Sequence, residues 1–157
     1  MQAVEYLSQA KRLDALIDNK RDEERELWAL ATSMTQNSDG MPHGTSNPDK
    51  MTNIVQKIIA ARERTNAVID QYVDAKQDII KHIEMLPRKQ YEVLYWLYIK
   101  KREKRKPGEN WYYTWSEVAE NMGCSEQNIC NTRRRALKNL QKLLDSEENS
   151  ERLLVFE

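Results

Sequence analysis

The sequence predicts an all-α fold: a long antiparallel helical hairpin, similar to a coiled coil, followed by a helix-turn-helix domain. Three observations point to this fold class. Through the first 85 residues, apolar side chains recur every three or four positions, which is the period of an amphipathic helix. The 157 residues include only four Gly and four Pro, too few for a turn-rich β-sandwich. Capping signals then divide residues 86–145 into short helices.

The N-terminal half predicts two long helices within residues 1–85, separated by a loop at residues 37–49. The loop holds two of the four Gly and two of the four Pro, and Asn47-Pro48 suits the start of the second helix. Each helix carries a seam with alternating steps of three and four residues. The first seam is Tyr6, Ala10, Leu13, Ile17, Lys20, Glu24, Leu27, Ala31 and Met34, and the second is Met51, Ile54, Ile58, Ala61, Thr65, Val68, Tyr72, Ala75, Ile79 and His82.

Folding one helix back on the other sets a register in which paired residue numbers sum to about 85. Lys20 then lies opposite Thr65, and Glu24 lies opposite Ala61. This polar layer either fixes the register or receives a partner. A two-helix hairpin leaves apolar flanks, so we expect a third helix, or a second copy of the chain in a homodimer, to cover them. The flanking residues are Leu7, Leu16, Trp28, Leu30, Val55, Ile59 and Ile69.

The domain predicted at residues 86–145 starts with an apolar helix over residues 88–99. Its predicted core face is Val93, Leu94, Trp96 and Leu97. Residues 114–144 then show the spacing of a helix-turn-helix, in which two helices are joined by a short turn that contains Gly. The signals are a capping box at Thr114 and Glu117, a left-handed cap at Gly123 and an N-cap at Ser125, before a helix whose apolar stripe is Ile129, Ala136, Leu137, Leu140, Leu143 and Leu144.

Residues 86–144 resemble region four of bacterial sigma factors, the domain that reads the −35 promoter element. The resemblance rests on Leu86-Pro87, Glu92-Val93-Leu94, Thr114, Glu117-Val118-Ala119, Gly123-Cys124-Ser125, Ile129, Arg135-Ala136-Leu137 and Leu140. The whole chain is more loosely similar to small sigma-like transcription regulators that phages and prophages of Gram-positive bacteria encode. The resemblance implies a regulator that binds double-stranded promoter DNA, with or beside RNA polymerase. The chain departs from the family in lacking a recognisable region two and in carrying an insertion at residues 100–113.

In a helix-turn-helix the second helix enters the DNA major groove. The predicted base contacts are Glu126, Gln127, Asn128 and Asn131, because amides pair with adenine and a carboxylate accepts from cytosine. The predicted phosphate contacts are Ser125, Arg134, Arg135 and Lys138 on this helix, with Lys100, Lys101 and Arg102 of the KKREKRK run as a clamp. Alternatively, the basic residues form solvated faces, and Glu126 only favours the helix dipole.

Other side chains of this half leave two interpretations open. The cluster of Trp111, Tyr112 and Tyr113 either closes the core against Trp96 or stacks on unpaired bases. Arg133 lies nearer the core side of its helix, where an acid such as Glu117 is a candidate partner.

The sequence contains no pattern that predicts an enzyme, a cofactor or a metal site. It has no Gly-rich phosphate loop and no His-Glu-x-x-His, and its cysteines, Cys124 and Cys130, lack zinc-site spacing. We expect reduced thiols, a cytoplasmic location and no membrane partner, because no apolar run approaches the ~20 residues that span a bilayer.

The formal charge of zero hides an uneven distribution. Residues 86–145 hold 13 basic and 7 acidic groups, a net of +6, whereas residues 1–85 and the acidic, then apolar, tail at 146–157 each carry −3. A basic domain is therefore compatible with DNA. Two alternatives remain: a DNA-packaging adaptor of the small-terminase kind, and a protein-only inhibitor that occupies the sigma-binding surface of polymerase.

Overall fold

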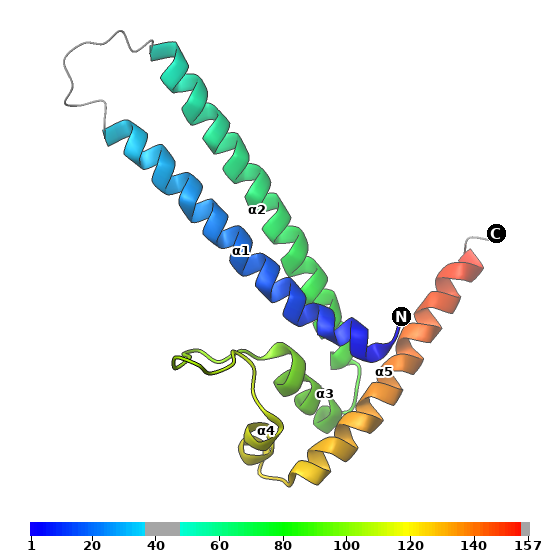
Figure 1. Cartoon of the computed structure of the whole chain (residues 1–157). Helices are drawn as coiled ribbons and strands as arrows, with labels where there is room; N and C mark the ends of the chain where they lie inside the picture. Colours follow the sequence, from blue (N-terminus) through cyan, green and yellow to red (C-terminus); the bar gives the residue numbers. More distant parts are fainter. Residues whose placement is uncertain (37–47, 155–157) are drawn as a thin grey trace. The chain divides into compact units, whose positions relative to one another are not determined.

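The computed structural model of the chain describes residues 1–36 and 48–154, which form an all-helical structure (Figure 1). This confirms the predicted all-α class. Within the described residues, extended pairing is limited to one bridge between Lys101 and Tyr112. The helices are α1 (Ala3–Gln36), α2 (Pro48–Glu84), α3 (Arg88–Leu94), the π-helical turn η2 (Tyr95–Ile99), α4 (Trp115–Met122) and α5 (Glu126–Leu154). The predicted loop at 37–49 lies outside the described residues as far as residue 47.

The chain divides into two compact units, and the boundaries differ from the sequence-based ones at residues 85 and 145. One unit is Leu13–Ala75, and the other combines Met1–Arg12 with Lys76–Glu157. The first turns of α1 and the last turns of α2 therefore pack with the C-terminal half of the chain.

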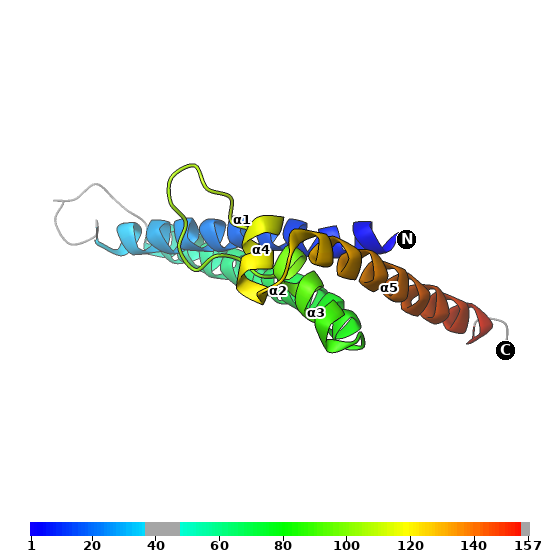
Figure 2. The same ribbon diagram turned by 90° about the horizontal axis from the view of Figure 1, so that it is seen from below.

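In the unit Leu13–Ala75, α1 and α2 run side by side in opposite directions (Figures 1 and 2). Their register is marked by Arg62, which forms an ion pair with Glu24 and lies 4.5 Å from the ring centroid of Trp28. Glu24 thus contacts the residue next to Ala61, its predicted partner. Thr65 is buried and donates its hydroxyl to the Ala61 carbonyl at 3.0 Å, so the polar layer satisfies its own hydrogen bonds.

The other unit holds a well-developed core in which α5 packs on α3 and α4. The core comprises Leu86, Val93, Leu94, Leu97, Tyr98, Ile99, Val118, Ala119, Ile129, Ala136 and Leu140, with Ile79, Ile83, Ala3, Leu7 and Ala10 from the ends of α2 and α1. The predicted core face of residues 88–99 is only partly right, because Trp96 is half-buried while Tyr98 and Ile99 are buried. The π-helical turn explains the difference: Lys100 N bonds to Tyr95 O, five residues back, at 2.9 Å, which breaks the 3.6-residue period.

The start of α1 and the end of α2 are tied to α5 by polar contacts. Gln141 accepts from Ala3 N at 2.7 Å and donates to Met1 O at 3.1 Å. Tyr6 and His82 share a 2.7 Å hydrogen bond, and the other ring nitrogen of His82 lies 2.7 Å from Glu147. Burial, together with the charges of Asp78 and Glu147, raises the pKa of Tyr6 to about 12.

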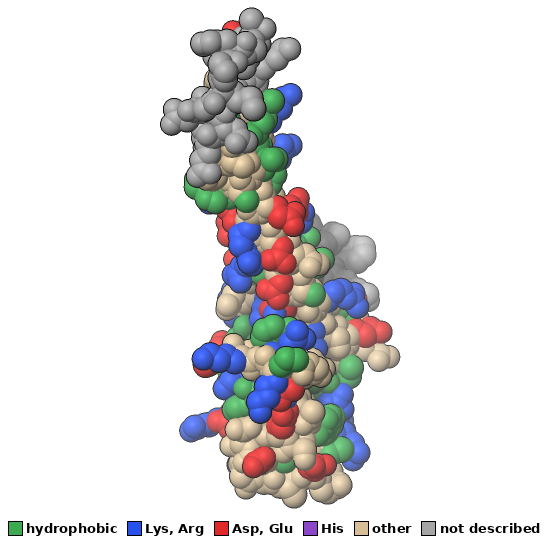
Figure 3. All heavy atoms as spheres, turned by 60° about the vertical axis from the view of Figure 1, so that its left-hand side comes forward, with side chains coloured by type: hydrophobic (Ala, Val, Ile, Leu, Met, Phe, Trp, Pro, Cys, Tyr) green, Lys and Arg blue, Asp and Glu red, His purple; other side chains and the backbone are tan. Residues whose placement is uncertain are grey.

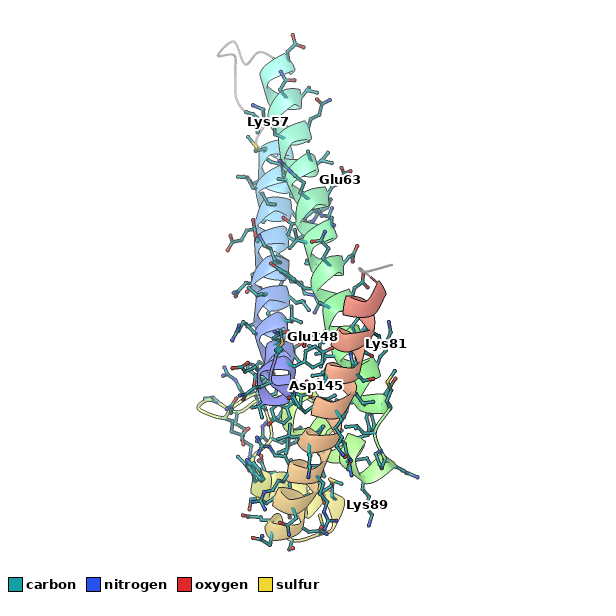
Figure 4. All side chains as sticks on the ribbon, turned by 90° about the vertical axis from the view of Figure 1, so that its right-hand side faces the viewer. Lys57, Glu63, Lys81, Lys89, Asp145 and Glu148 are labelled. Atoms are coloured by element: carbon teal, nitrogen blue, oxygen red, sulfur yellow. The ribbon has the colours of Figure 1, made fainter. Side chains whose placement is uncertain are left out.

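The residues predicted as an acidic, then apolar, tail at 146–157 are helical as far as Leu154. Helix α5 was expected to end at Leu144, but it continues to Leu154 (Figure 4, where Lys81, Asp145 and Glu148 mark α2 and α5). The acidic stretch keeps helical hydrogen bonding, and the contact of Glu147 with His82 holds it against α2. Residues 155–157 lie outside the described part of the chain.

Candidate nucleic-acid interface

Helices α4 and α5 are joined by a three-residue turn whose caps match the predicted ones. Thr114 Oγ1 accepts from Glu117 N at 3.4 Å, and the Glu117 carboxylate accepts from Thr114 N at 2.7 Å. Gly123 ends α4 with φ 64°, a left-handed conformation that glycine adopts without strain. Ser125 Oγ accepts from Asn128 N at 3.2 Å and so caps α5. The local sequence therefore fixes the angle at which α5 leaves α4.

Helix α5 has one buried face and one exposed polar face in its first five turns. Ile129, Ala136 and Leu140 are buried against α3 and α4, while Leu143 is half-buried. All the predicted contact residues at this helix are exposed: Ser125, Glu126, Gln127, Asn128, Asn131, Arg134, Arg135 and Lys138. After Glu126 this face carries amides first and cations second, without a carboxylate as far as Lys142.

The side chains at the start of α5 are organised by hydrogen bonds among themselves. Gln127 Nε2 donates to Asn131 Oδ1 at 3.4 Å, one turn further along the helix. Glu126 accepts from the hydroxyl of Ser116 on α4 at 2.7 Å. This bond gives Glu126 a third role beside the two expected ones, because it links the starts of the two helices.

Residues 100–113, predicted to be an insertion whose basic start forms a wing-like phosphate clamp, form a loop that we call the wing. Its two sides are joined by the isolated Lys101–Tyr112 bridge and by a bond from Arg102 N to Trp111 O at 2.9 Å. Its tip is a type II turn, with Pro107 second and Gly108 third at φ 87°, closed by Glu109 N donating to Lys106 O at 3.1 Å.

The three basic residues predicted to clamp phosphate from this segment each lie near another side chain of the protein. Lys100 Nζ lies 3.9 Å from the ring centroid of Trp96, and Lys101 Nζ lies 5.9 Å from that of Trp111. Arg102 Nη2 donates to both carboxylate oxygens of Glu117, at 2.7 and 2.6 Å, and its side chain is only 15% exposed. Arg102 therefore anchors the wing to α4.

This anchor changes the ionisation of both partners. The hydrogen bond from Arg102, followed by the bond from the Thr114 backbone, holds the pKa of Glu117 below its ordinary value. The hydrogen bond to Glu117 likewise raises the pKa of Arg102. The exposed basic residues of the wing are instead Lys104, Arg105 and Lys106, nearer its tip.

The suggested pairing of Arg133 with Glu117 is wrong, because Arg102 occupies that carboxylate. Arg133 donates to the hydroxyl of Tyr98 through Nε at 3.0 Å and Nη2 at 2.7 Å. Its guanidinium also lies 5.2 Å from the ring centroid of Trp115. A buried tyrosine on η2, which sequence reasoning had not assigned a role, is thus the partner that holds Arg133.

The aromatic cluster is divided between core and surface. Tyr113 meets Trp96 edge-to-face with ring centroids 4.9 Å apart, as the core interpretation predicts. Trp111 and Trp115 remain 41% and 38% exposed. Figure 3 shows Lys and Arg side chains next to hydrophobic ones at the level of the wing, and Arg105 indeed lies 5.0 Å from the Trp111 ring centroid.

The described residues offer no other obvious site. Residues 1–36 and 48–154 contain no cluster of three or more His, Cys, Asp or Glu side chains that could hold a metal ion. None of the helices described is both long and apolar enough to cross a bilayer. Cys124 and Cys130 are free thiols, each half-buried. No family model, curated protein or solved structure matches the chain.

Proposed function

We propose that the chain is a DNA-binding transcription regulator that places α5 in the major groove of promoter DNA. In this proposal α4 and α5 act as a helix-turn-helix, and RNA polymerase is a second partner. The observation that carries the proposal is the exposed face of α5, where amides at the first two turns are followed by cations. Amides can hydrogen-bond to base edges in the groove, and cations can bind the phosphates at its margin.

The roles follow from position on the helix. Gln127, Asn128 and Asn131 are proposed to read base edges, since an amide can bond adenine N6 and N7 together. Glu126 would accept from cytosine N4, at the cost of its bond to Ser116. Phosphates would be held by Ser125, Arg134, Arg135 and Lys138.

The wing adds a second set of phosphate contacts in this proposal. Because Lys100 and Arg102 are engaged with Trp96 and Glu117, the contacts move to exposed residues near the tip. Lys104, Arg105 and Lys106 offer three cations there, with Glu103 and Glu109 beside them. The family resemblance of residues 86–144, the net charge of +6 over residues 86–145 and the placement of these cations support the same conclusion.

Selection of bound duplexes from a random DNA pool, with and without bacterial RNA polymerase, tests this function. A shared sequence should emerge, and Gln127→Ala or Asn131→Ala should relax it at one position each, at a cost of ~1–3 kcal/mol on the preferred site. Arg134→Gln serves as the matched change, because it should weaken all duplexes alike. If no sequence is enriched under either condition, the proposed readout is wrong.

A further inference from the structure

Few of the apolar side chains described in the unit Leu13–Ala75 are buried. Among its described residues, the buried apolar side chains are Ile17 and Ile58 alone, and all the others lie in the second unit. Leu16, Trp28, Leu30, Ile54 and Ile59 are exposed on the same two helices. Exposed apolar side chains grouped on one element are of the kind that a partner surface covers.

A groove runs along one side of the seam of this hairpin. The groove is lined by Lys20, Glu23 and Leu27 from α1 and by Ala61, Arg64, Thr65 and Val68 from α2. Residues spaced by four and three follow the groove along both helices. They are Leu16, Lys20, Glu23, Leu27 and Leu30 on α1, and Lys57 (labelled in Figure 4), Ala61, Arg64, Val68, Gln71 and Ala75 on α2. This spacing is that of helices which pack along their length in a bundle.

The charges of the groove are arranged so that the face complements itself. Glu23 is about half exposed and belongs to α1, where Lys20 pairs with it at 2.7 Å, whereas the exposed Arg64 belongs to α2. Both line the groove, and the Glu24–Arg62 ion pair places them at the same level along the hairpin. Figure 3 shows acidic and basic side chains side by side along the hairpin. An acid and a base at equal height, on opposite edges of one face, suit a two-fold axis that runs along the hairpin.

We propose that this face binds the same face of a second copy, with α1 of each chain packed along α2 of the other. In that arrangement Glu23 meets the partner's Arg64, and Leu27 packs near the partner's Ala61. A two-fold axis across the hairpin at the same level would instead place Glu23 against the partner's Glu23, which like-charge repulsion disfavours. The product is a four-helix bundle in which residues 13 and 75 of both chains lie at one end.

The proposal is independent of DNA binding, because it concerns only the first unit. Sedimentation velocity of the full chain without nucleic acid, over a range of concentrations at low salt, should show a monomer–dimer equilibrium. Glu23→Arg and Arg64→Glu should each raise the dimer dissociation constant about tenfold or more, because each places like charges together. Arg25→Glu is the control: it changes the charge as Arg64→Glu does, but it lies 200° around α1 from Glu23.

Mixing the two single variants provides a rescue. A chain with Glu23→Arg is basic at both positions and one with Arg64→Glu is acidic at both, so the mixture should form heterodimers with nearly the parental dissociation constant. The double variant should dimerise by itself. Far-UV circular dichroism checks that each variant stays helical, and the rescue excludes misfolding as the cause of a weakened dimer.

Several results would overturn the proposal. A parental chain that is monomeric throughout, or one that forms a ring of many subunits, contradicts it directly. Single variants that dimerise like the parent show that this face is not the interface. If Arg25→Glu weakens the dimer as much as Arg64→Glu does, or if mixing the two single variants does not restore the dimer, the weakening comes from the change in net charge and not from contacts at this face.

Discussion

Adjacent arginines on α5 have different surroundings. One contacts side chains of the fold, and the other two are exposed, where DNA could be bound. Arg133 points its guanidinium at the Tyr98 hydroxyl and the Trp115 ring, whereas Arg134 and Arg135 are exposed. The helical period predicts that Arg133 lies nearer the core than its neighbours, but it does not predict Tyr98 as the partner. The direction of each follows from the 100° turn per residue, which places Arg133 closest to the buried Ala136 and Ile129.

Alanine at each of two neighbouring positions should therefore have opposite consequences. Arg133→Ala should lower the free energy of unfolding by about 1–3 kcal/mol, because two charge-assisted hydrogen bonds to Tyr98 are lost. Arg134→Ala should leave the unfolding midpoint within error and weaken duplex binding instead. Denaturant unfolding measures the stability of each variant, and fluorescence anisotropy measures its duplex binding. Equal losses of stability in the two variants would contradict the different roles assigned to Arg133 and Arg134.

Glu117 should make the stability of the domain depend on pH. Its folded pKa lies below its ordinary value of 4.5, so its stabilising effect is present above pH 4.5 and is lost as the pH falls through the folded pKa. Thermal unfolding from pH 7 to pH 3 should show this loss, and Glu117→Gln should flatten it. Glu120→Gln, an exposed change on the same helix, is the control and should keep the parental profile.

At the scale of elements, short sequence patterns predicted the helix caps, but they did not predict which side chains contact each other across the fold. Thr114 with Glu117, Gly123 and Ser125 each predict a cap because the bonding groups lie within three residues of one another. A wing-like clamp was predicted from the basic run at residues 100–106, but its anchor was not, because Arg102 bonds to Glu117, 15 positions away. Its tip has the local signal Pro107-Gly108, the residue pair that a type II turn prefers.

The tip and the base of the wing should respond differently to loss of charge. Lys104→Gln with Lys106→Gln should reduce the salt dependence of duplex binding by ~1 in slope per phosphate contact, with little change in stability. Arg102→Gln should lower the unfolding temperature, because it releases the wing from α4. Anisotropy titrations at several salt concentrations and thermal unfolding distinguish the two; a stable Arg102→Gln variant with a reduced slope would favour the original phosphate assignment.

For the molecule as a whole, the repeating apolar pattern sufficed to predict two long helices and their approximate register. Glu24 contacts Arg62 where pairing near Ala61 was expected, because a seam specifies register to about one position. The pattern could not predict the division into units. That division depends on long-range contacts, such as those of Gln141 with the first residues of the chain and of Glu147 with His82, which no periodicity encodes.

Charge is unevenly distributed between the basic domain and the acidic segments that flank it. Residues 86–145 carry +6 in total, and the acidic segments on either side return the sum to zero. Those segments repel DNA, so one domain alone should hold its site weakly at physiological salt. Dimerisation through the groove of the first unit would join two such domains and strengthen binding by raising their effective concentration.

Duplex binding by the full chain as a function of salt tests the central claim most directly. We predict that the logarithm of the association constant falls linearly with the logarithm of salt concentration, and that Arg134→Gln with Lys138→Gln reduces the slope by ~2. Arg25→Glu, which makes the same total change of charge on the exposed side of α1, should leave the slope unchanged. Binding that is absent at low ionic strength, or a slope that both changes reduce equally, would contradict a DNA-binding role for α5.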